Sequence, residues 1–361
     1  MLYYFFTSLI DQYSFFNVFK YLTFRTGLSV MTSLVVVFLI GGPLIKIFSE
    51  KMITGPIRQD GPIDHIVKKS GTPTMGGVII IIGIITSTLL WADLKNIYVW
   101  TLIFVSLSLG GLGFLDDMLK IKYKNSSGLK SRYKFTGQLI ISVITLLILI
   151  KYTNHEYLYN LYFPFFKNLI LHMGLFFIPF GLFVIIGASN AVNLTDGLDG
   201  LATVPVMLVA LSFTLISYVV GNTIFSEYLK IQYIPSVGEL SIFCGSIVGA
   251  CLGFLWYNAP PAKIFMGDTG SLSLGGSLAA IAIIVKHEIV LAIIGGLFVL
   301  ETISVIIQVV SFKLTGRRIF KMAPIHHHFE KKGWAESTIV IRFWIIAIIL
   351  ALIGLATLKL R

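Results

Sequence analysis

Charged side chains are scarce in this sequence. They make up 12% of 361 residues, whereas apolar residues make up 56% and the mean hydropathy is +0.88. A soluble globular chain carries about 25% charged residues. This chain cannot cover its surface with polar groups, which excludes a soluble globular protein and also a disordered or collagen-like one. The composition therefore predicts an integral membrane protein.

Cysteine is almost absent, with only Cys244 and Cys251, both in one apolar run. Seven residues along a helix span ~10 Å, too far for an unstrained disulfide. We expect two small buried side chains, and a disulfide scaffold is excluded.

Acidic residues are fewer than basic ones, which gives a net charge of +11. The sequence has no basic run interleaved with stacking aromatics in a soluble segment, so we expect no nucleic-acid partner. Membrane proteins gather Lys and Arg in their cytoplasmic loops, which is the simpler explanation.

The first 24 residues lack the basic start of a cleavable signal and carry Asp11 where its apolar core would lie. They hold ten aromatic residues. Aromatic rings favour the headgroup level of a bilayer. Residues 1–24 are therefore predicted to form an interfacial segment.

Long apolar runs predict an all-α, polytopic membrane protein with about ten transmembrane helices. The runs fall at about 25–48, 76–91, 97–115, 137–151, 174–191, 200–220, 239–257, 271–286, 289–312 and 337–358. The two short runs are expected to extend into flanking residues. No soluble segment is large enough to fold alone, so residues 1–361 are expected to form one integral membrane domain.

Lys and Arg are distributed unevenly between the two sides of this topology. One side carries 18 of them, in loops at 46–75, 116–136, 190–200, 258–270 and 313–336, and the other side carries 8. The excess predicts that these loops face the cytoplasm. An even number of spans then places both termini outside.

Seven of the nine aspartates also fall on the predicted cytoplasmic side. They are Asp60, Asp64, Asp116, Asp117, Asp196, Asp199 and Asp268. An acid at the mouth of a helix bundle is costly unless it is solvated, paired or bound to a cation. Because three loops each place acids at a span end, a cation site is predicted there.

The adjacent pair Asp116-Asp117 follows an apolar run. Neighbouring carboxylates repel unless a cation relieves them, and hard oxygen ligands suit Mg²⁺. The alternative is a solvated acidic helix end beside Lys120 and Lys122.

The segment 193–200 reads NLTDGLDG and packs two carboxylates, an amide and two glycines between spans. Asn193, Asp196 and Asp199 could hydrogen-bond a base or ribose, or complete a metal shell. A helix cap is the alternative, but a cap needs only one Asp.

The segment 258–276 ends one span at two prolines and opens the next at Asp268. A helix N-terminus suits phosphate. Asp268 or Ser271 could instead be a simple cap, although a cap explains neither Lys263 nor Phe265.

Two further loops carry weaker signals. Residues 69–77, with Lys69, two hydroxyl side chains and three glycines, could cradle an anion. Three consecutive histidines, His326-His327-His328, cannot all point at one small ion, so phosphate contact or proton transfer is expected rather than zinc binding. A solvated loop is the alternative.

Glu301 lies in the middle of an expected span and shares one helical stripe with Ser304, Gln308 and Ser311. An acid at this depth is either functional or satisfied by neighbouring helices. The stripe indicates that this helix faces a polar groove.

Together these features are what a phosphoryl-transfer site needs. Carboxylates can bind Mg²⁺, cations and helix N-termini can bind phosphates, and glycines allow close approach of the backbone. Because no soluble nucleotide-binding domain is present, the loops must hold a nucleotide-linked donor. A site at the membrane surface could join it to a lipid-borne acceptor.

Five motifs give the chain a close resemblance to the bacterial phospho-N-acetylmuramoyl-pentapeptide-transferases, within the polyprenyl-phosphate hexosamine-phosphate transferases. They are GTPTMGG at 71–77, Asp116-Asp117, NLTDGLDGLA at 193–202, FMGDTGSL at 265–272 and MAPIHHHFEKKGW at 322–334. The resemblance covers nearly the whole chain beyond residue ~24. The last motif is typical of the muramoyl-pentapeptide branch.

The resemblance implies transfer from UDP-N-acetylmuramoyl-pentapeptide to undecaprenyl phosphate, giving lipid I and UMP. It also implies Mg²⁺, a homodimer, and a site on the cytoplasmic face of the bacterial inner membrane. Asp268 would bind Mg²⁺, Asp116 would deprotonate the lipid phosphate, and Asp117 would assist. The implied donor-binding residues are Asn193, Asp196 and Phe265 for uridine, and Lys69, Thr74, Asp199, His326, His327 and His328 for the phosphate and sugar region.

Two alternatives remain at this point. A sister transferase would move N-acetylglucosamine phosphate onto the same lipid, and the motif at 322–334 argues against it. A secondary transporter would place its site at the midplane between broken helices, whereas these acids lie at one membrane face.

Overall fold

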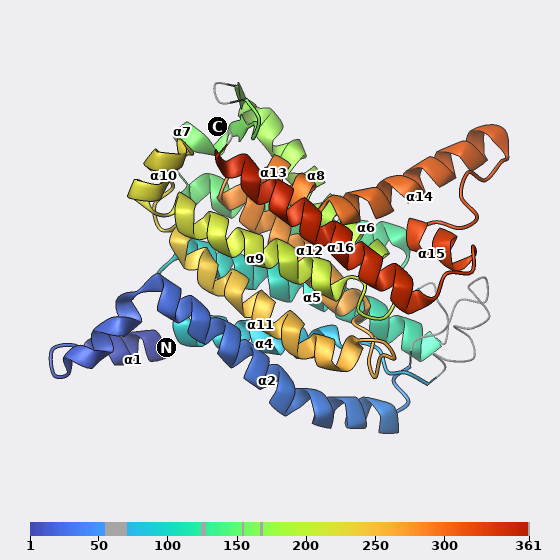
Figure 1. Ribbon diagram of the computed structural model, residues 1–361, viewed down its shortest axis with the longest axis horizontal. Helices are drawn as coiled ribbons and strands as arrows, with labels where there is room; N and C mark the ends of the chain where they lie inside the picture. Colours follow the sequence, from blue (N-terminus) through green and yellow to red (C-terminus); the bar gives the residue numbers. More distant parts are fainter. Residues whose placement is uncertain (55–70, 124–127, 154, 167–168, 360–361) are drawn as a thin grey trace.

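The computed structural model describes residues 1–54, 71–123, 128–153, 155–166 and 169–359, and these form a bundle of roughly aligned helices (Figure 1). Within these residues, nine helices are long and apolar enough to cross a membrane. They are α2 (Leu22–Glu50), α5 (Ile97–Tyr123), α6 (Ser131–Tyr152), α8 (Phe177–Thr195), α9 (Thr203–Val220), α11 (Leu240–Asn258), α12 (Gly267–Ile284), α14 (Gly296–Thr315) and α16 (Glu336–Ala356). The prediction of an all-α polytopic membrane protein is confirmed.

The remaining expected span, 76–91, corresponds to α4 (Gly77–Trp91), which has 15 residues. At 1.5 Å per residue it is about 22 Å long, shorter than the hydrocarbon core of a bilayer. The expected extension occurs in α6, but α4 does not extend. Its first turn is instead completed by another loop, because the N–H groups of Gly76 and Gly77 donate to the carbonyls of Phe265 and Met266, both at 2.8 Å.

The expected ninth span, 289–312, is two helices rather than one. The break between α13 (Glu288–Ile294) and α14 falls at Gly295-Gly296. Glycine weakens a helix interior, and an apolar run alone does not reveal the interruption. In Figure 1, α14 diverges from the rest of the bundle and carries its C-terminal end outward.

The core lies around α12, nearly all of whose residues are buried. Helices α5, α8 and α4 pack against it, and α11 packs between α2 and α9. Cys244 and Cys251 are free and fully buried in α11, as expected.

The remaining elements are short and join the long helices. They are α1 (Leu2–Ser8), α7 (His155–Leu158), α10 (Thr223–Leu229), α15 (Ile325–Glu330), four 3-10 helices (Ser14–Lys20, Gly174–Phe176, Val237–Glu239 and Thr357–Lys359) and an antiparallel pair of strands, β1 (Asn160–Tyr162) and β2 (Ile170–His172). The N-terminal aromatic segment packs on the end of α4, where Phe6 and Phe19 stack with Trp91.

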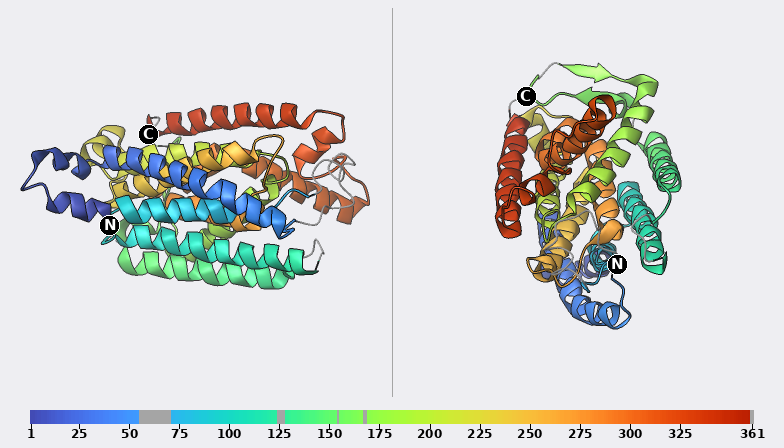
Figure 2. Two further views of the ribbon diagram at one scale, coloured as in Figure 1. Left: turned by 90° about the horizontal axis from the view of Figure 1, so that it is seen from below. Right: turned by 90° about the vertical axis from the view of Figure 1, so that its right-hand side faces the viewer.

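The two ends of the bundle differ. In both views along its length, α1 and the C-terminal end of α16 lie at one end, and α15 lies at the other (Figures 1 and 2). This arrangement agrees with an even number of crossings.

Candidate active site

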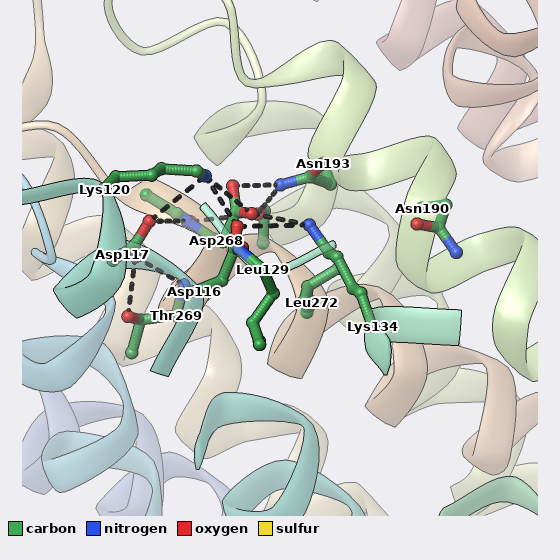
Figure 3. Close-up of polar contacts among 12 residues, drawn as sticks. Asp116, Asp117, Lys120, Leu129, Lys134, Asn190, Asn193, Asp268, Thr269 and Leu272 are labelled. Carbon is green, nitrogen blue, oxygen red and sulfur yellow. Dashed lines mark hydrogen bonds and ion pairs between the residues drawn. The ribbon is translucent and has the colours of Figure 1, made fainter. Parts of the chain in front are cut away.

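Three aspartates from two helices meet at the α15 end of the bundle. Asp116 and Asp117 lie on α5 and Asp268 lies in the first turn of α12, with one oxygen of each within 4.8 Å of the others (Figure 3). Asp116 is 2% and Asp117 is 4% exposed. The alternative of a solvated helix end is wrong, because α5 continues past the pair to Tyr123 and the pair is buried.

Glycines bring these helices close enough for the carboxylates to meet. A Cβ atom on Gly113 of α5 would lie 2.6 Å from the Thr269 nitrogen, and one on Gly77 of α4 would lie 2.7 Å from the Thr269 carbonyl carbon. Since neither residue has a side chain, both helices contact the backbone of the first turn of α12. Asp117 follows Gly113 by four residues on the same face, so this contact places its carboxylate at the start of α12.

Asp117 caps α12 from the neighbouring helix. It accepts hydrogen bonds from the N–H of Thr269 at 3.0 Å, the hydroxyl of Thr269 at 2.8 Å and the N–H of Asp268 at 3.3 Å. These N–H groups have no partner within the helix, and a negative charge there is favourable. The expectation that Asp268 could cap its own helix is wrong, and its carboxylate is therefore left for other partners.

Two lysines neutralise much of the cluster's charge. The Lys120 ammonium lies 2.7 Å from Asp116 and 2.9 Å from Asp268. The Lys134 ammonium lies 2.6 Å from Asp268 and 3.6 Å from Asp116. Neither lysine was predicted from the sequence to belong to the site. The i,i+4 spacing of Asp116 and Lys120 could have indicated the first, but Lys134 comes from α6 and carries no local signal.

The last turn of α8, with the segment that follows it, meets the cluster, as predicted. Asn193 donates its side-chain N–H to Asp268 at 2.7 Å and to the Ser271 hydroxyl at 2.9 Å. Burial, and then the negative charges of Asp268 and Asp117, raise the pKa of Asp196 to about 7. A backbone hydrogen bond from Gly267 opposes this rise.

Asp199 has a different environment. Its carboxylate accepts a hydrogen bond from the Ala262 N–H at 2.9 Å, and its own N–H donates to Glu336 at 2.9 Å. It therefore ties the segment after α8 to the segment before α12 and to α16. Within the described part of the chain, it does not join the three clustered carboxylates.

The loop before α4 lies against the same place. The Phe265 N–H donates to the Pro73 carbonyl at 2.9 Å. A Cβ atom on Gly267 would lie 2.7 Å from Asp117 and 3.1 Å from the Thr74 hydroxyl, and Gly267 has a φ of +73° that favours glycine. Thr74 is therefore a neighbour of the cluster, whereas Lys69 lies outside the described residues.

Each histidine of the triple has its own carboxylate or backbone partner. His326 Nδ1 lies 3.1 Å from Glu301, and His327 Nδ1 lies 2.6 Å from Glu330. His328 Nδ1 accepts from the Lys321 N–H at 3.0 Å. Desolvation, then the charges of Lys332 and Lys321, hold the pKa of His328 below its usual value. In this structure the three rings do not converge on one point.

The carboxylate cluster fits a metal ion by its chemistry. It offers three hard oxygen donors, and within the described residues it is the one group of three or more ligand-type side chains close enough to share an ion. Carboxylate oxygens are the usual protein ligands of divalent hard cations. The ammonium groups of Lys120 and Lys134 contact Asp268 of this cluster at 2.9 and 2.6 Å.

Comparisons with known proteins match this region. Residues 99–286 match glycosyl transferase family 4, and residues 69–81 match the phospho-N-acetylmuramoyl-pentapeptide-transferase signature 1. The chain is 68% identical to the phospho-N-acetylmuramoyl-pentapeptide-transferase of Pelagibacter ubique (strain HTCC1062) over 361 residues, which is 100% of both chains. It is 54% identical to that of Maricaulis maris (strain MCS10) over 371 aligned residues, again 100% of both.

The chain belongs to the phospho-N-acetylmuramoyl-pentapeptide-transferase family. The resemblance drawn from the motifs is thereby confirmed, and the family decides against both a secondary transporter and the N-acetylglucosamine sister transferase. The region matched by glycosyl transferase family 4 runs from α5 to just beyond α12 and contains all three clustered aspartates.

Proposed function

We propose that this chain transfers phospho-N-acetylmuramoyl-pentapeptide from its UDP-linked donor to undecaprenyl phosphate. The products are lipid I and UMP, in the first membrane step of peptidoglycan synthesis. The observation that carries the proposal is the buried cluster of three aspartates and two lysines at one end of the bundle. Family membership supports the identity of both substrates.

Both substrates are anionic, so the reaction depends on positioning and charge neutralisation. Asp268, with Asp116 and Asp117 beside it, would hold Mg²⁺, which neutralises charge on the donor diphosphate when bound. Lys120 and Lys134 now pair with the carboxylates at 2.6–2.9 Å. On substrate binding, we expect them to turn to phosphate oxygens instead.

Asp116 is proposed to take the proton of the lipid phosphate, leaving an anionic oxygen to attack the donor. The UMP group then leaves with the electron pair of the broken P–O bond. Asp117 assists by fixing the first turn of α12, which supports Asp268.

The donor is proposed to lie across the loops beside the cluster. Asn193, Asp196 and Phe265 would hold uridine, with the Phe265 ring stacking on the base. The residues proposed to line the phosphate and sugar region are Lys69, Thr74, Asp199, His326, His327 and His328. The contact of Asn193 with Asp268 supports this placement, because it joins the proposed base site to the proposed metal site.

The cellular setting is part of the proposal. The site would face the cytoplasm from the inner membrane of a bacterium, and the enzyme would form a homodimer. The excess of Lys and Arg in the loops at the α15 end supports the orientation.

UMP release by the purified chain tests the function. Release should require UDP-N-acetylmuramoyl-pentapeptide, undecaprenyl phosphate and Mg²⁺ together, and should stop when EDTA is added. Equal release with UDP-N-acetylglucosamine as donor would contradict the assignment. The same preparation can be examined by mass measurement in detergent, where a monomer would contradict the homodimer.

A further inference from the structure

The proposed mechanism gives no role to the most deeply buried acid of the α15 end. Glu301 and His326 each have 0% exposure, and the His326 Nδ1 lies 3.1 Å from a Glu301 oxygen. The two residues come from different elements, α14 and α15. A buried carboxylate without a partner is strongly disfavoured, so this contact accounts for Glu301 at its depth in the span.

The other edge of the His326 ring lies against the segment that carries Asp196. A Cβ atom on Gly197 would lie 2.9 Å from His326 Cε1 and closer still to Nε2. Any side chain at position 197 would therefore push the ring away. The imidazole is held between the Glu301 carboxylate on one side and the Gly197 backbone on the other, one residue from a proposed uridine-binding side chain.

The 3.1 Å contact between His326 Nδ1 and Glu301 is an ion-pair distance without hydrogen-bond geometry in this structure, so neither ring nitrogen and neither Glu301 carboxylate oxygen has a hydrogen bond among the described residues. Within these residues, Nε2 differs from Nδ1 in that no carboxylate lies beside it. Nε2 is buried as well. Buried polar atoms are nearly always hydrogen-bonded, so a buried nitrogen without a protein partner is available to bond a ligand. The neighbouring histidines do not share this feature, because His327 pairs with Glu330 and His328 with Lys321.

The rest of the Glu301 stripe anchors the segment that leads into α15. Gln308 donates to the Phe320 carbonyl at 2.9 Å and accepts the Ile319 and Phe320 N–H groups at 3.1 and 2.9 Å. The predicted polar groove along α14 is therefore filled by the returning chain. Gln308 holds the loop, and Glu301 alone of the stripe reaches a histidine.

We infer that Glu301 is a positioning residue for the transferase, which fixes His326 so that its Nε2–H donates to an oxygen of the nucleoside diphosphate. This inference rests on the proposed function. A carboxylate beside Nδ1 that accepts the Nδ1–H fixes the orientation of an imidazole. A hydrogen bond from an N–H held in this way to an anionic oxygen is charge-assisted and therefore strong.

A double-mutant cycle tests the inference. The variants are Glu301→Gln, His326→Ala and the pair together, with Ser304→Ala as the matched control. Ser304 is buried on the same stripe, and its hydroxyl donates to the Glu301 carbonyl without touching His326. The measurements are UMP affinity by calorimetry, and kcat and KM for the UDP-linked donor.

Glu301→Gln should weaken UMP binding and raise the donor KM by roughly 10- to 100-fold, the usual cost of losing a residue that orients an active group. The double variant should be no worse than His326→Ala, because Glu301 acts through the ring. Glu301→Asp, which keeps the charge, should recover part of the loss, and Ser304→Ala should match the wild type.

The inference would be overturned if the loss of UMP affinity in the double variant equalled the product of the two single-variant losses, or if Glu301→Gln bound UMP as well as the wild type. Glu301 would then be a packing residue. Melting temperatures of all variants in detergent separate misfolding from a positioning effect. If the wild type binds UMP but does not release it from the donor, the proposed reaction fails, while the cycle on UMP affinity still decides the role of Glu301. If the wild type neither binds nor releases UMP, both fail.

Discussion

At the residue scale, the main feature of the site is that only a few groups compensate the negative charge of three carboxylates. Asp116, Asp117 and Asp268 are compensated by Lys120 and Lys134 and by the start of α12. The Asp268 carboxylate contacts both ammonium groups and Asn193, and it does not cap α12. It is the carboxylate best placed to exchange its partners for a metal ion.

Asp268→Asn is therefore expected to cost roughly 10²-fold or more in UMP release, because it removes one charge that stabilises the reacting groups. Its size is unchanged, so the melting temperature should stay close to that of the wild type. The control is Asp93→Asn at the opposite end of the bundle, where Asp93 bonds Tyr4. Near-normal turnover of Asp268→Asn at ordinary Mg²⁺ would contradict the metal role.

Asp196 provides a pH-dependent prediction without substrate. Burial and the nearby carboxylates raise its folded-state pKa to about 7, against about 3.9 in an unfolded chain. The unfolded state therefore loses this proton first, so the group destabilises the fold as pH rises from about 4 to about 7. Asp196→Asn should remove that loss.

The measurement is the melting temperature in detergent and EDTA at pH 5 and pH 8. The gain from Asp196→Asn should be larger at pH 8 than at pH 5, because only the ionised carboxylate is disfavoured. A gain that is equal at both pH values would show that Asp196 titrates normally.

At the element scale, hydropathy predicted the spans and missed how they meet. The sequence predicted that Asp116-Asp117, Asp268 and the segment 193–200 belong together, because acids at span ends are costly. It could not place Lys134, since its approach to Asp268 depends on the packing of α6 against α5 and α8. Nor could it show that Asp117 caps α12, which requires the register between two helices.

The contact between α5 and α12 can be tested with a matched pair of glycines. Gly113→Ala would place a Cβ 2.6 Å from the Thr269 nitrogen, whereas a Cβ on Gly111 has no atom within 4 Å. Gly113→Ala must therefore push α5 from α12 and separate Asp117 from the N–H groups that it caps. We expect a lower melting temperature and a loss of UMP release.

Gly111 lies on the same helix, and Gly111→Ala should keep the melting temperature and the UMP release of the wild type. Its stability could even rise slightly, because alanine favours helices. Equal behaviour of the two variants would mean that the close contact does not hold the site together.

At the scale of the whole molecule, the charge distribution and the fold agree on two distinct ends. The carboxylate cluster and α15 lie at one end, and α1 with the end of α16 lies at the other (Figure 1). Hydropathy and loop charge could predict this much because each follows from local sequence. Neither reveals the break at Gly295-Gly296 or the contact of Glu301 with His326, because both depend on where α14 goes after it leaves the bundle.

Orientation in the membrane is the last prediction, and cysteine labelling can decide it. Cys244 and Cys251 are fully buried, so they should react little with the reagent. If they do react, both can be replaced by alanine. Single cysteines are then introduced at two exposed positions, Thr223 on α10 and Lys332 after α15, at opposite ends of the bundle. An impermeant maleimide added to intact spheroplasts should label Thr223→Cys. It should reach Lys332→Cys only after the membrane is opened, because the basic loops are expected to stay in the cytoplasm. The reverse pattern would place the carboxylate cluster on the outer face of the membrane. The UDP-linked donor could not reach it there, and the proposed reaction would be contradicted.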